Sequence, residues 1–435
     1  MKKNKLKAIC ATCHTHRHAP LKFPKGFLWG AATSAHQVEG RNNNNDWWAW
    51  EQEGGHIKNK DTSGKATDHY NRYQEDFDLA KNFKHNTHRF SLEWSRIEPK
   101  PGVFNKAALD HYEDVLKALK KRKLEPMVTL HHFTNPLWFS KKGGWQKHSS
   151  VHHFNAYVEK VVKRYKKYVT LWCTINEPFV YASNSYTKGN WPPQKKSFWA
   201  TPRVLSHMAD AHKMAYKTIH RAYPKNIKPQ VGFAHNHISF THYGNGITDY
   251  LYEWLLNNIW NGWFYRKTKG THDFIGLNYY FYHRIKKGRG AYAASDADRD
   301  VTDMGWEIYP GGIFRALIEL STHNLPIYIT ENGLASVNDH RRSRFIVAHL
   351  KEVYHAIKAG VDVRGYYHWS LTDNFEWDKG FAPRFGLVHI DYDDDFERTP
   401  RNSANVYARI CKENAINHDL MRFVGHDAED EPPVS

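Results

Sequence analysis

Eight short apolar segments recur along the chain, and longer segments of helical character lie between them. The apolar segments have the length expected of buried strands. They are Phe27–Thr33, Asn86–Leu92, Pro126–His132, Thr170–Asn176, Gln230–Asn236, Phe274–Tyr279, Pro326–Glu331 and Arg364–Ser370. Alternation of strand and helix predicts parallel pairing, because a parallel connection needs a crossover. Eight such units predict an α/β fold closed into a single (β/α)8 TIM barrel.

The segments between these strands have apolar residues at spacings of three and four, which is typical of helices that pack on one face. They include His69–Asn82, Lys106–Arg122, Val151–Tyr168, Pro202–Tyr223 and Asp339–Ala359. The alternative is a doubly wound open sheet, which requires a glycine-rich phosphate turn after its first strand. The sequence from Gly30 to Thr33 lacks the G-x-G-x-x-G pattern, so the barrel is favoured.

The 435 residues are enough for two or three domains, but no linker-like segment interrupts residues 21–423. We expect one barrel there, a short polar, Cys- and His-rich and disordered extension over 1–20, and an acidic tail over 424–435. No apolar run reaches the roughly 18 to 20 residues that span a bilayer. Four cysteines are too few for a disulfide framework, and no apolar leader is visible, so we expect a cytoplasmic protein.

Polar and aromatic side chains end almost every expected strand, where the chemistry of such barrels collects. In chain order they are Gln37, Arg89, His132, Asn176 with Glu177, Asn236 with His237, Asn278 with Tyr280, Glu331 with Asn332, and Trp369. Amides, imidazoles and indoles suit a neutral, hydroxyl-rich ligand. A phosphate ligand would need more lysine, arginine or a glycine nest. The pattern therefore predicts a sugar site.

Glu177 and Glu331 end the fourth and seventh strands, which face each other across a barrel mouth. Two opposed carboxylates are what glycoside hydrolysis needs. A separation of about 5 to 5.5 Å gives retention and about 6.5 to 9.5 Å gives inversion, and the residues alone leave both open. Taken singly, each glutamate also fits a structural role. Their joint position favours a catalytic pair.

Six motifs in chain order resemble glycoside hydrolase family 1, the β-glucosidase family. They are Phe27–Gly40, Trp94–Ile97, Thr174–Pro178, Asn278–Tyr280, Ile329–Gly333 and Trp369–Trp377. The resemblance extends from about Leu21 to Asn414 and implies a retaining mechanism with no required cofactor or metal. It implies that Glu177 is the acid/base and Glu331 the nucleophile, held by Arg89 and Tyr280.

The same resemblance implies a sugar-binding set that consists of Gln37, His132, Asn176, Asn278, Trp369, Glu376, Trp377 and Phe385. The family's 6-phosphoglycosidases replace the Glu376-Trp377 pair, and its thioglucosidases replace the acid/base glutamate by glutamine; neither replacement is present here. We therefore expect hydrolysis of terminal unphosphorylated β-D-glucosides, with galactosides and fucosides as further candidates. Transglycosylation through the same intermediate is an alternative.

Two stretches depart from the family pattern. Phe133 follows His132 where the family usually has Trp, so an indole N–H donor is lost. The stretch from His235 to Asp273 is about 25 residues shorter than the family leads us to expect. We hypothesise that its aromatic residues line an opening for a bulky aglycone; the alternative is that they fill the gap as core. They are Trp254, Trp260, Trp263, Phe264 and Tyr265.

The extension contains a third departure. Cys10-Ala11-Thr12-Cys13-His14 matches the C-x-x-C-H pattern of covalent haem attachment, and His16 and His18 add metal-binding capacity. Haem, a loosely bound zinc or nickel ion, and an unstructured tail are the three interpretations, of which the tail is favoured.

The chain carries 62 Lys and Arg against 45 Asp and Glu, a net charge of +17. A noncatalytic polyanion-binding protein is therefore a competing interpretation. The basic clusters are Lys117–Lys123, Lys163–Lys167, Arg284–Arg289 and Arg341–Arg344. They fall mostly on expected outer helices, so we expect a small-molecule β-glucoside partner and no nucleic acid. The sequence leaves the oligomeric state open.

Several histidines are expected at the surface, where they would add charge below a pH of about 6.5. They are His85, His88, His111, His148, His152 and His153.

Overall fold

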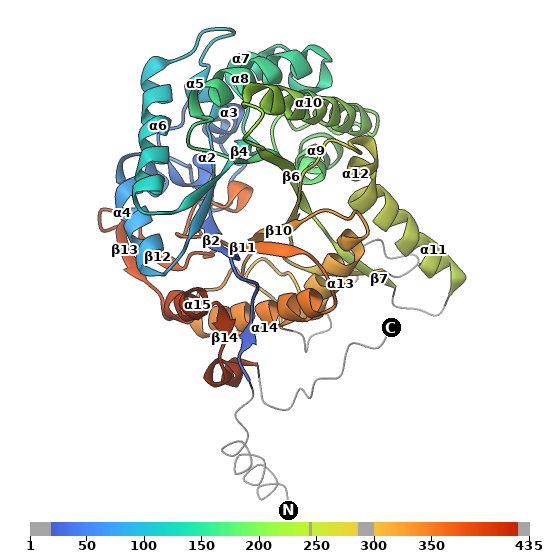
Figure 1. Ribbon diagram of the computed structural model, residues 1–435. Coiled ribbons are helices and arrows are strands. Elements are labelled where there is room, and N and C mark those ends of the chain that lie inside the picture. Colours follow the sequence, from blue (N-terminus) through green and yellow to red (C-terminus); the bar gives the residue numbers. More distant parts are fainter. Residues whose placement is uncertain (1–18, 243–245, 286–299, 425–435) are drawn as a thin grey trace, which may run out of the picture.

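The computed structural model describes residues 19–242, 246–285 and 300–424. Eight parallel strands close into a barrel in the order β10-β11-β2-β3-β4-β5-β6-β8 (Figure 1). Their bounds are β2 Leu28–Ala32, β3 Thr87–Ser91, β4 Glu125–His131, β5 Leu171–Asn176, β6 Gln230–Asn236, β8 Ile275–Asn278, β10 Ile327–Asn332 and β11 Val363–Trp369. The predicted (β/α)8 barrel is confirmed, and each expected strand agrees with an observed strand to within one residue at either end.

The barrel closes where β2 pairs on one side with β11 and on the other with β3. At this seam Gly30 lies against Thr87, and a Cβ atom on Gly30 would stand 2.4 Å from the Thr87 carbonyl oxygen. Only glycine permits so close an approach of the two strands. The G-A-A segment of the first strand therefore serves barrel closure.

Amphipathic helices surround the barrel with their apolar stripes turned inward. In α6, for example, Leu109, Tyr112, Leu116 and Leu119 are buried, and the Asn105 side chain caps the first turn. The longer helices are α4 His69–Asn82, α6 Lys106–Lys121, α8 Ser149–Tyr165, α10 Ala200–Ala222, α13 Pro310–Ser321, α14 Asp339–Lys358 and α15 Asn402–Glu413.

Shorter helices and strands lie in the segments that connect or follow the barrel strands. The helices are α2 Ala35–Val38, α3 Asp46–Glu53, α5 Trp94–Ile97, α7 Leu137–Lys141 and α9 Pro178–Ala182. The short 3-10 and π helices are η1 Lys58–Lys60, η2 Gly144–Gln146, η3 Ser183–Lys188, η5 Trp377–Lys379 and η6 His418–Phe423. The strands β12 Val388–Asp391 and β13 Glu397–Pro400 form an antiparallel pair.

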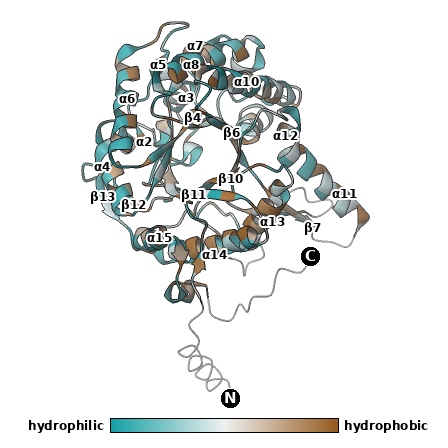
Figure 2. Ribbon diagram, viewed as in Figure 1, coloured by the Kyte–Doolittle hydropathy of each residue, from teal (hydrophilic) through white to brown (hydrophobic). Residues whose placement is uncertain are grey.

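The stretch between β6 and β8 forms a projection beside the barrel (Figures 1 and 2). Strand β7, Ser239–His242, pairs in parallel with β9, Tyr282–Ile285. The helices α11, Ile247–Leu256, and α12, Trp263–Lys267, are joined by a π-helical turn, η4, Asn257–Gly262. Phe264 and Tyr265 are buried in the main core, so for these two residues the core alternative is correct. Trp254 is exposed, and Trp260 and Trp263 are partly buried.

The first and last described strands tie the ends of the barrel domain together. Strand β1, Leu21–Lys22, pairs with β14, Ala415–Ile416, in antiparallel orientation. The Asn414 side chain donates to the Phe23 carbonyl and accepts from the Trp29 indole. Because β1 directly precedes β2, this tie lies at the amino-terminal ends of the barrel strands, opposite their carboxyl ends.

Two histidines expected at the surface lie inside the protein. His85 and His88 are buried, and burial lowers the pKa of each to about 3. His111 is partly buried and its pKa is lowered to about 4 for the same reason. The expectation is therefore wrong for His85 and His88, which stay neutral as pH falls through 6.5, whereas His148 and His152 are exposed. Polar type alone does not reveal such buried imidazoles.

The extension motif Cys10, Cys13 and His14, and residues 425–435 of the expected tail, lie outside the described residues. Within the described ranges, no group of three or more His, Cys, Asp or Glu side chains is arranged to hold a metal ion. The helices of these ranges include none that is both long and apolar enough to cross a bilayer.

Candidate active site

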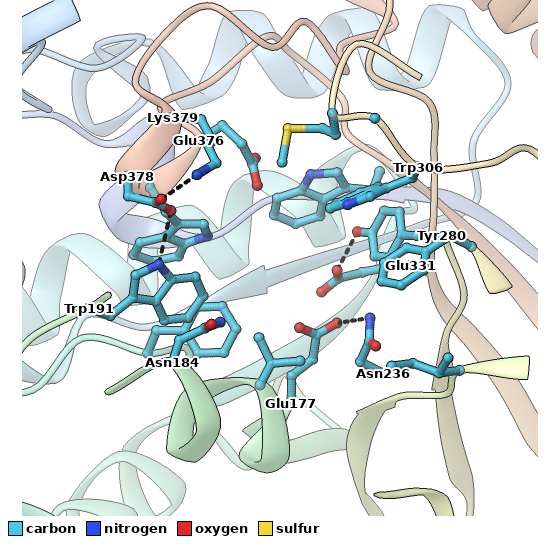
Figure 3. A pocket seen from close by; sticks show the side chains of 18 of the residues that line it. Glu177, Asn184, Trp191, Asn236, Tyr280, Trp306, Glu331, Glu376, Asp378 and Lys379 are labelled. Atoms are coloured by element: carbon cyan, nitrogen blue, oxygen red, sulfur yellow. Dashed lines mark hydrogen bonds and ion pairs between the residues drawn. The ribbon is translucent and has the colours of Figure 1, made fainter. Parts of the chain in front are cut away.

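A cavity of about 760 Å³ opens at the carboxyl ends of the barrel strands (Figure 3). Ten of the twelve predicted site residues line it, namely Gln37, His132, Asn176, Glu177, Tyr280, Glu331, Trp369, Glu376, Trp377 and Phe385. The other two, Arg89 and Asn278, do not line the cavity, but each hydrogen-bonds one of the two glutamates. The barrel therefore brings all twelve side chains to one place.

Glu331 lies near the end of β10 between a cation and a phenol. Arg89 Nη1 is 2.5 Å from Glu331 Oε1, and both side chains are almost completely buried. The Tyr280 hydroxyl donates to Glu331 Oε2 over 2.6 Å. Burial and the charge of Glu331 raise the pKa of Tyr280 well above its usual value, so the phenol keeps the proton that it donates. The two neighbours stabilise a negative carboxylate.

Glu177 follows β5 and precedes α9, with its backbone in the left-handed region at φ 44°. Such conformations are uncommon outside glycine and cluster at active sites. Asn278 Nδ2 donates to Glu177 Oε1 over 2.8 Å and Asn236 Nδ2 over 3.3 Å. Burial and the charge of Glu331 raise the pKa of Glu177 to about 8. The raised pKa favours the protonated form of Glu177.

A hydrogen-bond network joins the surroundings of the two glutamates. Arg89 Nη2 donates to Asn176 Oδ1 over 2.6 Å, and Asn278 Nδ2 lies 3.2 Å from the same oxygen. The Thr330 hydroxyl donates to Asn278 Oδ1 over 2.6 Å. Because each amide is fixed on both its oxygen and nitrogen sides, its orientation is determined. The network holds both carboxylates in a preorganised arrangement.

Gln37 and Glu376 form a polar corner of the cavity. Gln37 Nε2 donates to Glu376 Oε2 over 3.2 Å and to Asn374 Oδ1 over 3.1 Å. Burial and the charge of Asp378 raise the pKa of Glu376 to about 8. A carboxyl group next to an amide offers both donors and acceptors, which suits adjacent hydroxyl groups of a ligand.

Parallel rings form another wall. His132 is nearly parallel to Trp369 and Trp377, with centroids 5.9 Å and 6.1 Å away. Burial and the nearby Arg89 charge lower the pKa of His132 well below its usual value, so the imidazole is neutral. Its Nε2 atom lies 3.2 Å from Asn176 Nδ2 and accepts a hydrogen bond there.

Phe133, the residue that departs from the family pattern, lines the cavity beside this wall. Its ring centroid lies 5.1 Å from that of Trp377 and 5.0 Å from that of Trp191. Trp191 lines the cavity, and its indole nitrogen donates to Asp378 over 2.9 Å. Asp378 also pairs with Lys379 at 2.6 Å (Figure 3). An indole from a different loop therefore lies next to Phe133.

Several cavity residues were not among the predicted site residues. Asn236, which contacts Glu177, ends a predicted strand and was visible as a polar strand end. Trp191 and Trp306 lie in connections between barrel strands, where the sequence has no periodicity that would predict a position in the cavity. Trp306 lies 5.5 Å from Tyr280 and 4.9 Å from Phe281 between ring centroids. These rings add an apolar surface to the cavity beside Tyr280.

The aromatics of the shortened stretch have different locations. Trp260, on η4, lines the cavity and donates from its indole nitrogen to the Asn236 carbonyl over 2.9 Å. Trp263 is not among the described lining residues. The hypothesised aromatic opening therefore consists of one tryptophan that extends the main cavity.

Comparison with known proteins agrees with this geometry. The model of the family described as Glycosyl hydrolase family 1 matches residues 19–269 and 264–416, which together span most of the chain. The chain belongs to glycosyl hydrolase family 1. This membership confirms the resemblance stated from the motifs, and with it O-glycoside hydrolysis as the class of activity.

Relatives cover nearly the whole family 1 domain. Beta-glucosidase A of Thermotoga maritima is 32% identical, over 91% of this chain and 99% of that protein. A beta-galactosidase of Pyrococcus woesei is 29% identical over 92% and 98%. The solved beta-glycosidase from Pyrococcus horikoshii is 39% identical with a TM-score of 0.86, covering 93% of this chain and 98% of that one. A family 1 b-glucosidase from Thermotoga maritima, solved with isofagomine lactam, is 30% identical with the same TM-score, over 91% and 100%.

The basic clusters lie away from the cavity, and none of their described residues except Arg284 lines it. Lys117 and Lys120 on α6 pair with Asp114 and Glu125, and Arg164 on α8 pairs with Asp110 and Glu113. Part of the third cluster, residues 286–289, lies outside the described ranges. Nothing in this arrangement favours a noncatalytic polyanion-binding protein over the family 1 enzyme.

Proposed function

We propose that this family 1 enzyme is a retaining β-glucosidase that hydrolyses terminal unphosphorylated β-D-glucosides. One observation carries the proposal: two buried glutamates share a cavity, yet Glu177 contacts only amide donors whereas Glu331 contacts a guanidinium and a phenol. The first environment favours a carboxylic acid and the second a carboxylate, as a double displacement requires.

In the first step, an oxygen of Glu331 attacks the anomeric carbon and forms a glycosyl ester. The bond from that carbon to the glycosidic oxygen breaks, its electron pair stays on the oxygen, and the Glu177 proton is transferred to it. In the second step, the Glu177 carboxylate removes a proton from water, and the water oxygen attacks the anomeric carbon. The ester bond to Glu331 breaks, so both glutamates return to their starting states with the configuration retained.

The remaining cavity residues support a glucosyl ring in this position. Gln37, His132, Asn176 and Glu376 supply directional partners for hydroxyl groups. Asn278, which does not line the cavity, positions Asn176 and Glu177. The tryptophans and the phenylalanine supply flat faces for the C–H face of the ring, namely Trp369, Trp377 and Phe385. A carboxyl group at Glu376 offers a phosphate group no positive charge, which supports unphosphorylated substrates. Galactosides and fucosides remain further candidate substrates.

The stereochemistry of the product tests the proposal. Proton NMR of an aryl β-glucoside reaction, recorded before mutarotation, should show β-glucose first. Early α-glucose would establish inversion and overturn the mechanism. Rates on the matching galactoside and fucoside rank the sugar preference.

Azide distinguishes the two glutamates. Glu177→Ala should be accelerated by azide on an activated aryl glucoside and give the β-glucosyl azide, because azide needs no general base to open the intermediate. Glu331→Ala should give the α-glucosyl azide, because azide then attacks the substrate directly. Identical products from both variants would contradict the assigned roles.

The proposal includes a barrel domain over residues 21–423 that works without a required cofactor, in the cytoplasm. Cys173 and Cys411 are buried free thiols, which supports a reducing compartment. Activity should survive exhaustive dialysis against a chelator, and cell fractionation tests the location.

A further inference from the structure

Helix α11 carries an apolar stripe that faces out of the molecule. Ile247, Tyr250, Leu251, Trp254 and Leu255 recur at the i, i+3, i+4, i+7, i+8 spacing of one helix face. Each of these five side chains, here called the α11 stripe, is between 43% and 86% exposed. In α6 the same spacing faces the barrel and is buried. Figure 2 shows hydrophobic residues along α11 on the projection beside the barrel.

The opposite face of α11 holds the helix in place. Asp249 is buried, and Leu256 packs against a small cluster formed by Ile238, Phe240 and Ile285. Glu253 Oε2 accepts hydrogen bonds from the backbone nitrogen of His242 at 2.9 Å and from its imidazole at 2.5 Å. The helix is therefore seated on β7 and β9, with its two acidic side chains turned toward the rest of the protein. An outward stripe on a seated helix indicates a surface meant for contact.

We propose that the α11 stripe docks the enzyme on the surface of an anionic lipid bilayer. Tyrosine and tryptophan prefer the headgroup level of a membrane, and leucine and isoleucine prefer the acyl boundary just beneath it. Ten residues of helix extend about 15 Å, which is too short to span a bilayer but suits a helix lying in its interface.

Charge selects an anionic lipid surface over a second copy of the chain. The net charge of +17 attracts the enzyme to anionic headgroups, whereas two copies repel each other. The same helical run continues through η4 into α12, and exposed Arg266, Lys267 and Lys269 follow the stripe. The two acidic residues of α11 are turned away, because Asp249 is buried and Glu253 is paired with His242.

Flotation with lipid vesicles tests this proposal without reference to catalysis. Wild-type full-length protein should float with vesicles of 70% POPC and 30% POPG, and about tenfold less with vesicles of POPC alone, because a short apolar stripe needs electrostatic attraction as well. The triple variant Leu251→Gln, Trp254→Gln, Leu255→Gln should lose binding to the anionic vesicles by about tenfold or more, since it removes most of the apolar contact.

The matched control is the double variant Val103→Gln, Val337→Gln, which removes exposed apolar side chains elsewhere, 54% and 75% exposed. It should bind as wild type does, and unchanged aryl glucosidase activity checks folding of both variants. Binding that persists in the triple variant would mean attraction by charge alone and would overturn the proposal. So would a failure of wild type to float, or light scattering that shows a wild-type dimer made monomeric by the triple variant.

Discussion

The two halves of the cavity hold the same residue type in opposite surroundings. On one side Glu331 contacts a guanidinium and a phenol; on the other Glu177 contacts the amides of Asn236 and Asn278. Both carboxyl groups are buried. An amide dipole offsets burial less than a full charge does, so the pKa of Glu177 rises to about 8. The difference shows that the neighbouring residues determine which glutamate is suited to the proposed role of acid/base and which to that of nucleophile.

The largest effect is expected when the carboxylate of Glu331 is removed. Glu331→Gln leaves no nucleophile, so kcat on an aryl β-glucoside should fall by about 10⁴-fold or more. Steady-state kinetics with purified protein measure this loss. Asp114→Asn removes an exposed carboxylate of α6 and should leave the rate near wild type. Full activity of Glu331→Gln would refute the mechanism.

The amide side should respond differently to the same substitution. Glu177→Gln removes the proton donor, so the loss should depend on the leaving group. We expect a fall in kcat/KM of about 10² to 10⁴ on an alkyl glucoside, which needs protonation, and a much smaller fall on a dinitrophenyl glucoside. Equal losses on the two substrates would show that Glu177 is not the acid.

A smaller effect is expected when Glu331 loses the hydrogen bond from Tyr280 but keeps its ion pair with Arg89. Tyr280→Phe deletes the hydroxyl that donates to Glu331 over 2.6 Å, and kcat should fall by about 10- to 100-fold because a positioned donor is lost. Tyr216→Phe is the control, since its hydroxyl donates to Asp273 away from the cavity. A similar loss in both variants would point to a general effect on folding.

The smallest expected effect concerns pH. With a Glu177 pKa of about 8, kcat/KM should fall above pH 8 as the free enzyme loses the acidic proton. The Asn278 amide stabilises the ionised form, so Asn278→Ala should move the alkaline midpoint upward by about half a unit. A pH profile of kcat/KM measures both. A downward movement would show that the amide does not act on Glu177 as described.

The barrel and its strand ends could be predicted because they depend on local patterns. Alternating apolar and helical segments specify the strands, and the strand ends place Glu177 and Glu331 on one face. Loop residues such as Trp191 and Trp306 could not be found in this way, because a loop has no periodicity that relates its position to a cavity.

Periodicity also leaves the direction of a helix face undetermined. Helices α6 and α11 share the same apolar spacing, yet the stripe of α6 is buried and that of α11 is exposed. The spacing predicts that a helix has an apolar face, but it does not predict whether another part of the protein covers that face. Buried His85 and His88 were missed for a related reason, since burial is set by neighbours distant in sequence.

The pairing of β1 with β14 has a practical consequence for handling the enzyme. Residues 21 and 416 meet at the amino-terminal ends of the barrel strands, and the cavity opens at their carboxyl ends. A fluorescent reporter, a resin linker or a fused module joined at either end of the domain would hang from the face opposite the cavity. In an enzyme immobilised through such a linker, the opening of the cavity would face the solution.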